Sequence, residues 1–147
     1  MTQTEQRSGT AERQVQNPWG GHYPATRTAL EAVLMRASSG RKLPSVHDCV
    51  LVTGCEFRSV IASGELAKYL RTDTLRKLGA ARFALHEIGA MDATAILSTT
   101  IAGLRRTSSQ RSEAQLLLKL EWDLLVRGRM LDELIARYAV NLPQSER

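Results

Sequence analysis

Four side chains are of the types best suited to bind a metal ion: His47, Cys49, Cys55 and His86. Imidazole and thiolate are ligands that Zn²⁺ prefers, and zinc sites usually contain close ligand pairs such as Cys-x-x-Cys. His47 and Cys49 form the single close pair here, and two residues along a helix turn by about 200°, so the two side chains diverge. The sequence therefore predicts no metal site and no cofactor.

The spacing of the two cysteines does not suit a disulfide. Six residues along a helix turn the chain by about 240° net, and six along a strand separate the thiols by about 20 Å. Neither arrangement brings the two sulfur atoms within bonding distance. We expect Cys49 and Cys55 to be reduced and buried, as free cysteines usually are.

Two His–acid neighbours, His47 with Asp48 and His86 with Glu87, could suggest general acid–base chemistry. Adjacent residues on a helix diverge by about 100°, so neither pair forms a local dyad, and we expect both histidines on exposed helix faces. The sequence also contains no glycine-rich phosphate loop and no Gly-x-Ser-x-Gly elbow. No enzyme is predicted. The enzyme hypothesis requires long-range contacts that place His47 or His86 in a pocket beside a carboxylate.

Length and composition predict one globular domain. The chain has 147 residues, of which 43% are hydrophobic and 24% charged. Residues 1–22 show no apolar period and are predicted to form a flexible tail. The domain is predicted to span residues 23–143, and residues 144–147 are predicted to form a C-terminal tail. Trp19 is the exception in the first tail, where it either packs on the domain or anchors a partner.

Apolar runs are short throughout. No run approaches the roughly 20 residues that cross a membrane, and the first 16 residues are polar, unlike a secretory signal. These features predict a cytoplasmic protein that does not associate with membranes.

Helical spacing of apolar residues predicts an all-α, compact single-domain bundle of five to seven helices. The segment after Ser45 also fits a strand, but a capping box of Ser45 with Asp48 favours a helix. Gly64 and Gly89 are expected to end helices. The region after Ser112 reads as one long helix or as two joined near Gly128, with two favoured. Expected N-caps are Thr72 or Asp73, Asp92 and Ser112.

The same spacing predicts which side chains face the core. The predicted inward stripes are Leu30, Val33, Leu34 and Ala37; then Leu75, Leu78, Ala81, Leu85 and Ile88; then Ile96, Leu97, Ile101 and Leu104; and finally Leu117, Leu120, Leu124, Leu131, Leu134 and Tyr138. Leu116, Leu117 and Leu118 are consecutive and cannot all face one core. We therefore predict a homodimer through this leucine-rich region.

Charge is distributed without a dominant patch. The net charge is +5, and residues 45–147 carry fourteen basic and twelve acidic side chains. Three arginines gather in a Ser/Thr-rich segment, where a solvated connector is the expected role and a phosphate contact the alternative; they are Arg105, Arg106 and Arg111. The acidic residues of the C-terminal region are expected to form a solvated helix face, with a partner-binding patch as the alternative; they are Glu113, Glu121, Asp123, Asp132 and Glu133.

Three stretches together resemble one bacterial family, a helical domain that includes a DNA-mimic protein. They are LVTGCEFRSVIASGE (51–65), ALHEIGAMDATAIL (84–97) and LEWDLLVRGRMLDELIARYAVNLP (120–143). Ile88-Gly89-Ala90 matches the family's middle motif, and Leu131-Asp132 through Tyr138 matches its last. The first motif matches in part, since Gly54-Cys55-Glu56 stands where the family has Asn-Gly-Gly before Phe57.

The resemblance implies a non-enzymatic helical domain that binds another protein. The DNA-mimic member presents carboxylates in place of phosphates, which requires a dense negative face. The near balance of charge over 45–147 departs from that requirement, so the resemblance extends to the fold and the partner-binding role and not to mimicry.

Two functional hypotheses follow in addition to the enzyme hypothesis above. The favoured one is a protein-binding module, a regulator or an immunity-type inhibitor that occupies a partner's surface. The alternative is a nucleic-acid-binding transcriptional regulator, supported by the net positive charge and the three arginines.

Overall fold

The structure is a computed structural model that describes residues 24–39 and 45–141, and it is helical throughout that part of the chain apart from turns and connectors. Seven helices are found there and no strand, which confirms the predicted all-α single-domain bundle. Trp19, the tail over 1–22 and the residues after 141 lie outside the described residues. The helices are α2 (Pro24–Ser39), α3 (Val46–Ser63), α4 (Leu66–Tyr69), α5 (Thr74–Ile88), α6 (Met91–Arg106), α7 (Gln110–Leu125) and α8 (Gly128–Val140).

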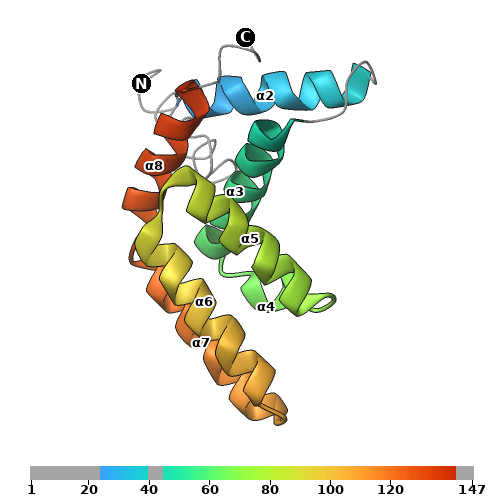
Figure 1. Cartoon of the computed structure of the whole chain (residues 1–147), viewed down its shortest axis with the longest axis vertical. Coiled ribbons are helices and arrows are strands. Elements are labelled where there is room, and N and C mark those ends of the chain that lie inside the picture. Colours follow the sequence, from blue (N-terminus) through green and yellow to red (C-terminus); the bar gives the residue numbers. More distant parts are fainter. Residues whose placement is uncertain (1–23, 40–44, 142–147) are drawn as a thin grey trace, which may run out of the picture.

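Helix α3 is the central element, and it contacts α2, α4, α5, α7 and α8. Helices α6 and α7 form an antiparallel hairpin whose tip, residues 107–109, points away from α2, and α8 then runs back toward α2 (Figure 1). The hairpin joins the rest of the bundle mainly through the packing of α6 on α5. One end of the molecule is thus a packed bundle and the other a two-helix projection.

The start and end of α3 follow the sequence signals. The Ser45 hydroxyl accepts the backbone N–H of Asp48 at 3.0 Å, as an N-cap does. Gly64 ends the helix at φ 72°, a left-handed conformation in which a side chain is strained. Leu51, Phe57 and Ile61 are at most 1% exposed. Because Val46–Ser63 forms one continuous helix, the strand alternative for this segment is wrong.

Two of the expected N-caps, Asp92 and Ser112, are placed differently in the structure, and the third, Asp73, is confirmed in position. Helix α6 begins at Met91 rather than after Asp92. Helix α7 begins after Ser109, whose hydroxyl accepts the N–H of Ser112, so Ser112 is the residue that is capped. Asp73 occupies the N-cap position of α5, but its φ is 55° and its side chain makes no capping hydrogen bond. Each signal located a helix start to within a few residues.

The inward stripes are confirmed except at the ends of α2 and α5. Leu30 and Val33 are buried, whereas Leu34 is 51% exposed and Ala37 is also exposed. Leu75 is 42% exposed while Leu78, Ala81, Leu85 and Ile88 are buried. At about 100° per residue, Leu34 and Leu75 lie at the edge of their stripes, and α2 packs mainly on α8 and α3. The predicted break near Gly128 is confirmed, since α7 ends at Leu125 and α8 begins at Gly128.

None of the helices between residues 24 and 141 combines the length and the apolar content that crossing a membrane requires.

Candidate functional site

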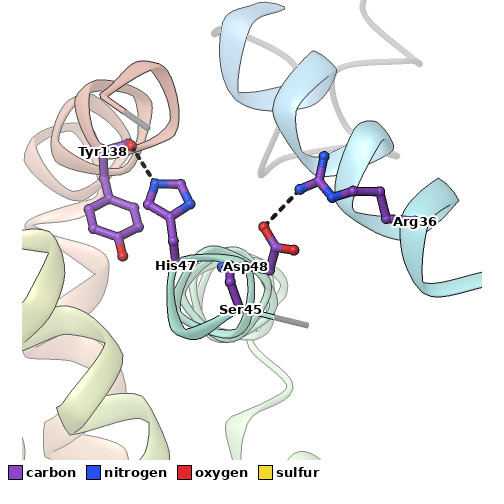
Figure 2. A network of polar contacts seen from close by, with 5 residues as sticks. All are labelled: Arg36, Ser45, His47, Asp48 and Tyr138. Carbon is purple, nitrogen blue, oxygen red and sulfur yellow. Dashed lines mark hydrogen bonds and ion pairs between the residues drawn. The ribbon is translucent and has the colours of Figure 1, made fainter. Parts of the chain in front are cut away.

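A buried polar network joins α2, α3 and α8 and contains the first candidate for chemistry, His47. The ring of His47 stacks on Tyr138 with centroids 4.3 Å apart and planes 10° apart. Its Nε2 lies 3.2 Å from the backbone carbonyl of Tyr138, which accepts that hydrogen bond (Figure 2). His47 is 6% exposed, so its expected place on an exposed face is wrong, because α8 folds back over α3. The other histidine, His86, has a side chain 59% exposed, as expected.

Asp48 leaves the same turn of α3 in a different direction from His47 and meets α2 (Figure 2). Its carboxylate accepts a hydrogen bond from Arg36 at 2.8 Å and is 9% exposed. The predicted capping box is therefore half right: Ser45 caps the helix, but Asp48 pairs with Arg36 and not with the Ser45 backbone. The two side chains thus connect two different helices, α8 and α2, to α3.

The cysteines differ in environment. Cys55 is 1% exposed, and burial, with a smaller effect from the Asp132 carboxylate, raises the pKa of its thiol to about 12. Such a thiol stays protonated and unreactive at neutral pH. Cys49 is exposed, which corrects the expectation that both are buried. Within residues 24–39 and 45–141, no three His, Cys, Asp or Glu side chains lie close enough together to hold a metal ion.

The five acidic residues predicted as a patch are divided among several roles, and two of them support the fold. Asp132 accepts hydrogen bonds from Arg58 at 2.8 and 3.2 Å, and these side chains are 13% and 12% exposed. Glu121 accepts the backbone N–H of Leu66 at 2.9 Å and so stabilises the start of α4. Both carboxylates thus have partners within the fold, and Asp132 is largely buried.

The other three predicted acidic residues lie nearer the surface. Glu133 is half-exposed and lies 3.8 Å from Arg129, one turn away on α8. Asp123 is half-buried on α7. Glu113, also half-buried, lines a groove beside α4 together with Glu121. Of the predicted acidic set, the structure thus brings Glu113 and Glu121 together at one groove.

The three arginines gather at the tip of the α6–α7 hairpin. Arg105 and Arg106 are in the last turn of α6, and Arg111 is in the first turn of α7, with residues 107–109 between them. All three are exposed, and Arg106 Nε donates to the Ala102 carbonyl at 3.3 Å. Figure 1 places this tip at the end of the molecule farthest from α2. The arginines are thus presented to solvent together.

The most prominent unexplained surface is apolar and lies on α7. Leu118, Trp122 and Leu125 are 66%, 65% and 43% exposed. Their spacing of four and three residues puts them on one side of the helix, and we call these three residues the α7 face. Val126, 61% exposed, extends it beyond the helix end. The opposite side of α7 carries Leu120 and Leu124, both fully buried.

A groove adjoins the α7 face and is lined by residues of both α7 and α4. Its volume is about 500 Å³, and its lining is mostly apolar; the lining residues are Leu66, Ala67, Gln110, Glu113, Ala114, Leu117, Leu118 and Glu121. Leu118 therefore belongs both to the groove and to the α7 face. The run of three leucines was predicted to seek a partner from the sequence, whereas Trp122 was not. The repeat of Leu118, Trp122 and Leu125 at helical spacing was the signal that could have found it.

Comparison with known proteins gives no match: no protein-family model, no curated protein and no solved structure is similar to this chain. The resemblance to the DNA-mimic-containing family thus stays a prediction based on short motifs. The surface of the described residues is the remaining guide to function.

Proposed function

We propose that this chain is a non-enzymatic protein-binding module, a regulator or antagonist that occupies a partner protein's surface through the α7 face. The observation that carries the proposal is the exposure of Leu118, Trp122 and Leu125 on one side of a helix whose other side is buried. Contiguous apolar surface is costly to leave in water, and on soluble domains it marks interaction sites. Tryptophan is among the residues that contribute most to binding energy at protein interfaces.

The polar groups of the interior support a binding role over a catalytic one. His47 bonds to a backbone carbonyl and stacks on Tyr138, and Asp48 pairs with Arg36. Neither ring nor carboxylate lines the groove beside α7. A general base must reach the proton it removes from a substrate, and these side chains are occupied in holding helices together.

The experiment that tests the proposal uses the full chain as bait in extract from its own cells. We compare the unaltered chain with Trp122→Glu, and use Phe83→Glu as the matched control, since Phe83 is 53% exposed on α5. We expect the unaltered chain and the control to recover the same protein, and Trp122→Glu to lose it. Recovery of the same proteins by all three chains would refute the α7 face as the binding surface.

A second candidate function, nucleic-acid binding, is favoured by one observation: Arg105, Arg106 and Arg111 are exposed in the two helix turns that flank the hairpin tip. Arginine binds phosphate through two parallel hydrogen bonds. Three such contacts predict a slope of about −3 in a plot of log affinity for duplex DNA against log salt concentration. Replacement of all three arginines with alanine is expected to abolish that slope. Absence of binding at low salt would exclude this candidate.

A further inference from the structure

We propose that Ser108, at the tip of the α6–α7 hairpin, is a phosphorylation site for a serine kinase that recognises arginine. The inference goes beyond the proposed binding function and does not depend on the α7 face. It starts from the connector between α6 and α7, which consists of three hydroxyl residues, Thr107, Ser108 and Ser109. Exposed arginines lie in the helix turns on both sides of this connector.

The three hydroxyl groups of the connector differ in what they contact. Ser109 Oγ accepts the N–H of Ser112 at 3.0 Å and donates to the Ser112 hydroxyl at 3.2 Å, so it is engaged in capping α7. Thr107 is half-buried. Ser108 is exposed, and no described residue forms a hydrogen bond with its hydroxyl. A phosphate on Ser108 therefore breaks no hydrogen bond of that hydroxyl within the described part of the chain.

The backbone of the connector makes the Ser108 hydroxyl accessible. Thr107 and Ser109 are extended, with ψ angles of 143° and 134°, and Ser108 lies between them outside both helices. By contrast, the hydroxyl of Ser63, in the last turn of α3, donates to the Val60 carbonyl of its own helix. A kinase must bring a catalytic carboxylate to the hydroxyl that it phosphorylates, so an exposed tip outside a helix suits the reaction.

The arginines before Ser108 supply the groups that a kinase would recognise. Arg105 and Arg106 stand three and two residues before it, and both are exposed. Guanidinium groups form strong hydrogen bonds with carboxylates, and kinases select substrates by such charge patterns. The sequence Arg-Arg-Thr-Ser thus combines an accessible hydroxyl with two positive charges at fixed distances along the chain.

Ser39, at the end of α2, provides a comparison within the same chain. It also follows an arginine, Arg36, by three residues. That guanidinium donates to the Asp48 carboxylate at 2.8 Å, and the Ser39 hydroxyl donates to the Arg36 carbonyl at 2.8 Å. Both the arginine and the hydroxyl are engaged there, so we expect no phosphate on Ser39.

In the transfer, the Ser108 oxygen attacks the γ-phosphorus of ATP, the bond from that phosphorus to the ADP oxygen breaks, and the hydroxyl proton passes to the kinase carboxylate. The product carries a charge of about −1.5 to −2 at neutral pH. Arg105, Arg106 and Arg111 all lie within three residues of it along the chain. The phosphate therefore offsets much of the positive charge of the tip.

The first test is mass spectrometry of peptides from the full chain isolated from its own cells, with phosphatase inhibitors present from lysis. We expect a phosphate on Ser108 and none on Ser39. Ser108→Ala should remove this phosphate, whereas Ser63→Ala, a change at an exposed serine without preceding arginines, should keep it. Absence of phosphate from the peptide that contains Ser108, or phosphate on Ser109 in its place, would overturn the proposal.

The second test measures the role of the arginines on the purified, folded chain. The probe is the catalytic subunit of cyclic-AMP-dependent protein kinase with ATP and Mg²⁺. Replacement of Arg105 and Arg106 together with alanine should lower the initial rate of phosphorylation at Ser108 by roughly tenfold or more, as the loss of hydrogen bonds to charged groups predicts. Arg111→Ala, after the serine, is the matched control and should leave the rate unchanged. Equal rates for all three chains would overturn the proposal, while the proposed function of the α7 face would stand.

Discussion

At the scale of single residues, the contact between Arg58 and Gly128 connects α3 to the start of α8. A Cβ atom at position 128 would lie 2.5 Å from Arg58 Nη2. Arg58 cannot move aside cheaply, because Asp132 holds its guanidinium with two hydrogen bonds. We expect Gly128→Ala to lower the free energy of unfolding by about 1–3 kcal/mol, as overpacking does, measured by urea denaturation.

Gly79 provides the matched control for that substitution. It lies within α5, and a Cβ atom there would meet no atom within 4 Å. Gly79→Ala should raise the free energy of unfolding by about 0.5–1 kcal/mol, because alanine favours the helix. Equal shifts in one direction for both variants would contradict the close contact at Gly128.

The Cys55 thiol predicts how stability depends on alkaline pH. Burial raises its pKa to about 12 in the folded chain, whereas in the unfolded chain the thiol ionises near 9. The unfolded state therefore loses a proton first, so the thiol's contribution to stability is complete below pH 9 and is lost as pH rises toward 12. The slope is about 1.4 kcal/mol per pH unit.

Denaturation of the unaltered chain and of Cys55→Ala at pH 8, 9 and 10 checks this prediction. We expect their difference in free energy of unfolding to shrink between pH 9 and 10. Tyr69, whose pKa burial also raises, titrates in both chains and cancels in that difference. A constant difference over this range would show that Cys55 ionises equally in both states.

The sequence predicted residue environments well where helical spacing decides them and poorly where a distant segment does. Leu97 and Leu124 are buried as their spacing requires. His47 was expected in solvent, but α8, about ninety residues later in the chain, covers it. Periodicity along one helix contains no information about which other helix packs on its edge.

At the scale of helices, the ion pair of Arg58 with Asp132 holds α8 against α3, and both side chains are almost buried. Removing one partner of such a pair leaves a charge without compensation. We expect Asp132→Ala to lower the free energy of unfolding by about 3 kcal/mol, measured by chemical denaturation.

The neighbouring residue Glu133 provides a control on the same helix. Its contact with Arg129 is 3.8 Å long, and the Arg129 side chain is 92% exposed. Exposed pairs of this kind contribute little to stability, so Glu133→Ala should change the free energy of unfolding by less than about 1 kcal/mol. Similar losses for the two variants would mean that the Arg58 pair is no stronger than a surface pair.

Helix ends show where local signals are sufficient. Gly64 and Gly89 end helices in the left-handed conformation, as their residue type predicts. Asp92 and Ser112 were wrong as N-caps: Asp92 lies in the first turn of α6, where the helix dipole favours a carboxylate, and Ser112 donates its N–H to the true cap, Ser109. A residue of the right type near a helix start therefore does not by itself identify the cap, since α6 begins after Ala90, which makes no side-chain cap.

At the scale of the whole molecule, the candidate site depends on contacts between distant segments. The groove exists because α4 packs on α7, and Glu121 joins them by accepting the N–H of Leu66, 55 residues away in sequence. Contacts between distant segments also divide the predicted acidic residues, since Glu121 binds the start of α4 and Asp132 pairs with Arg58. The helical spacing of apolar residues was sufficient to predict the fold class. The exposed side of α7 could be identified only from the structure, which shows which apolar residues of α7 are buried.

The central claim, that the chain binds a protein through the α7 face, is tested most directly by photocrosslinking in its own cells. Trp122 is replaced with the photoreactive aromatic benzoylphenylalanine, and Phe83 is replaced in the same way as the exposed control. The account predicts one discrete crosslinked product from position 122 upon illumination and none from position 83. No product from position 122, or the same products from both positions, would contradict it.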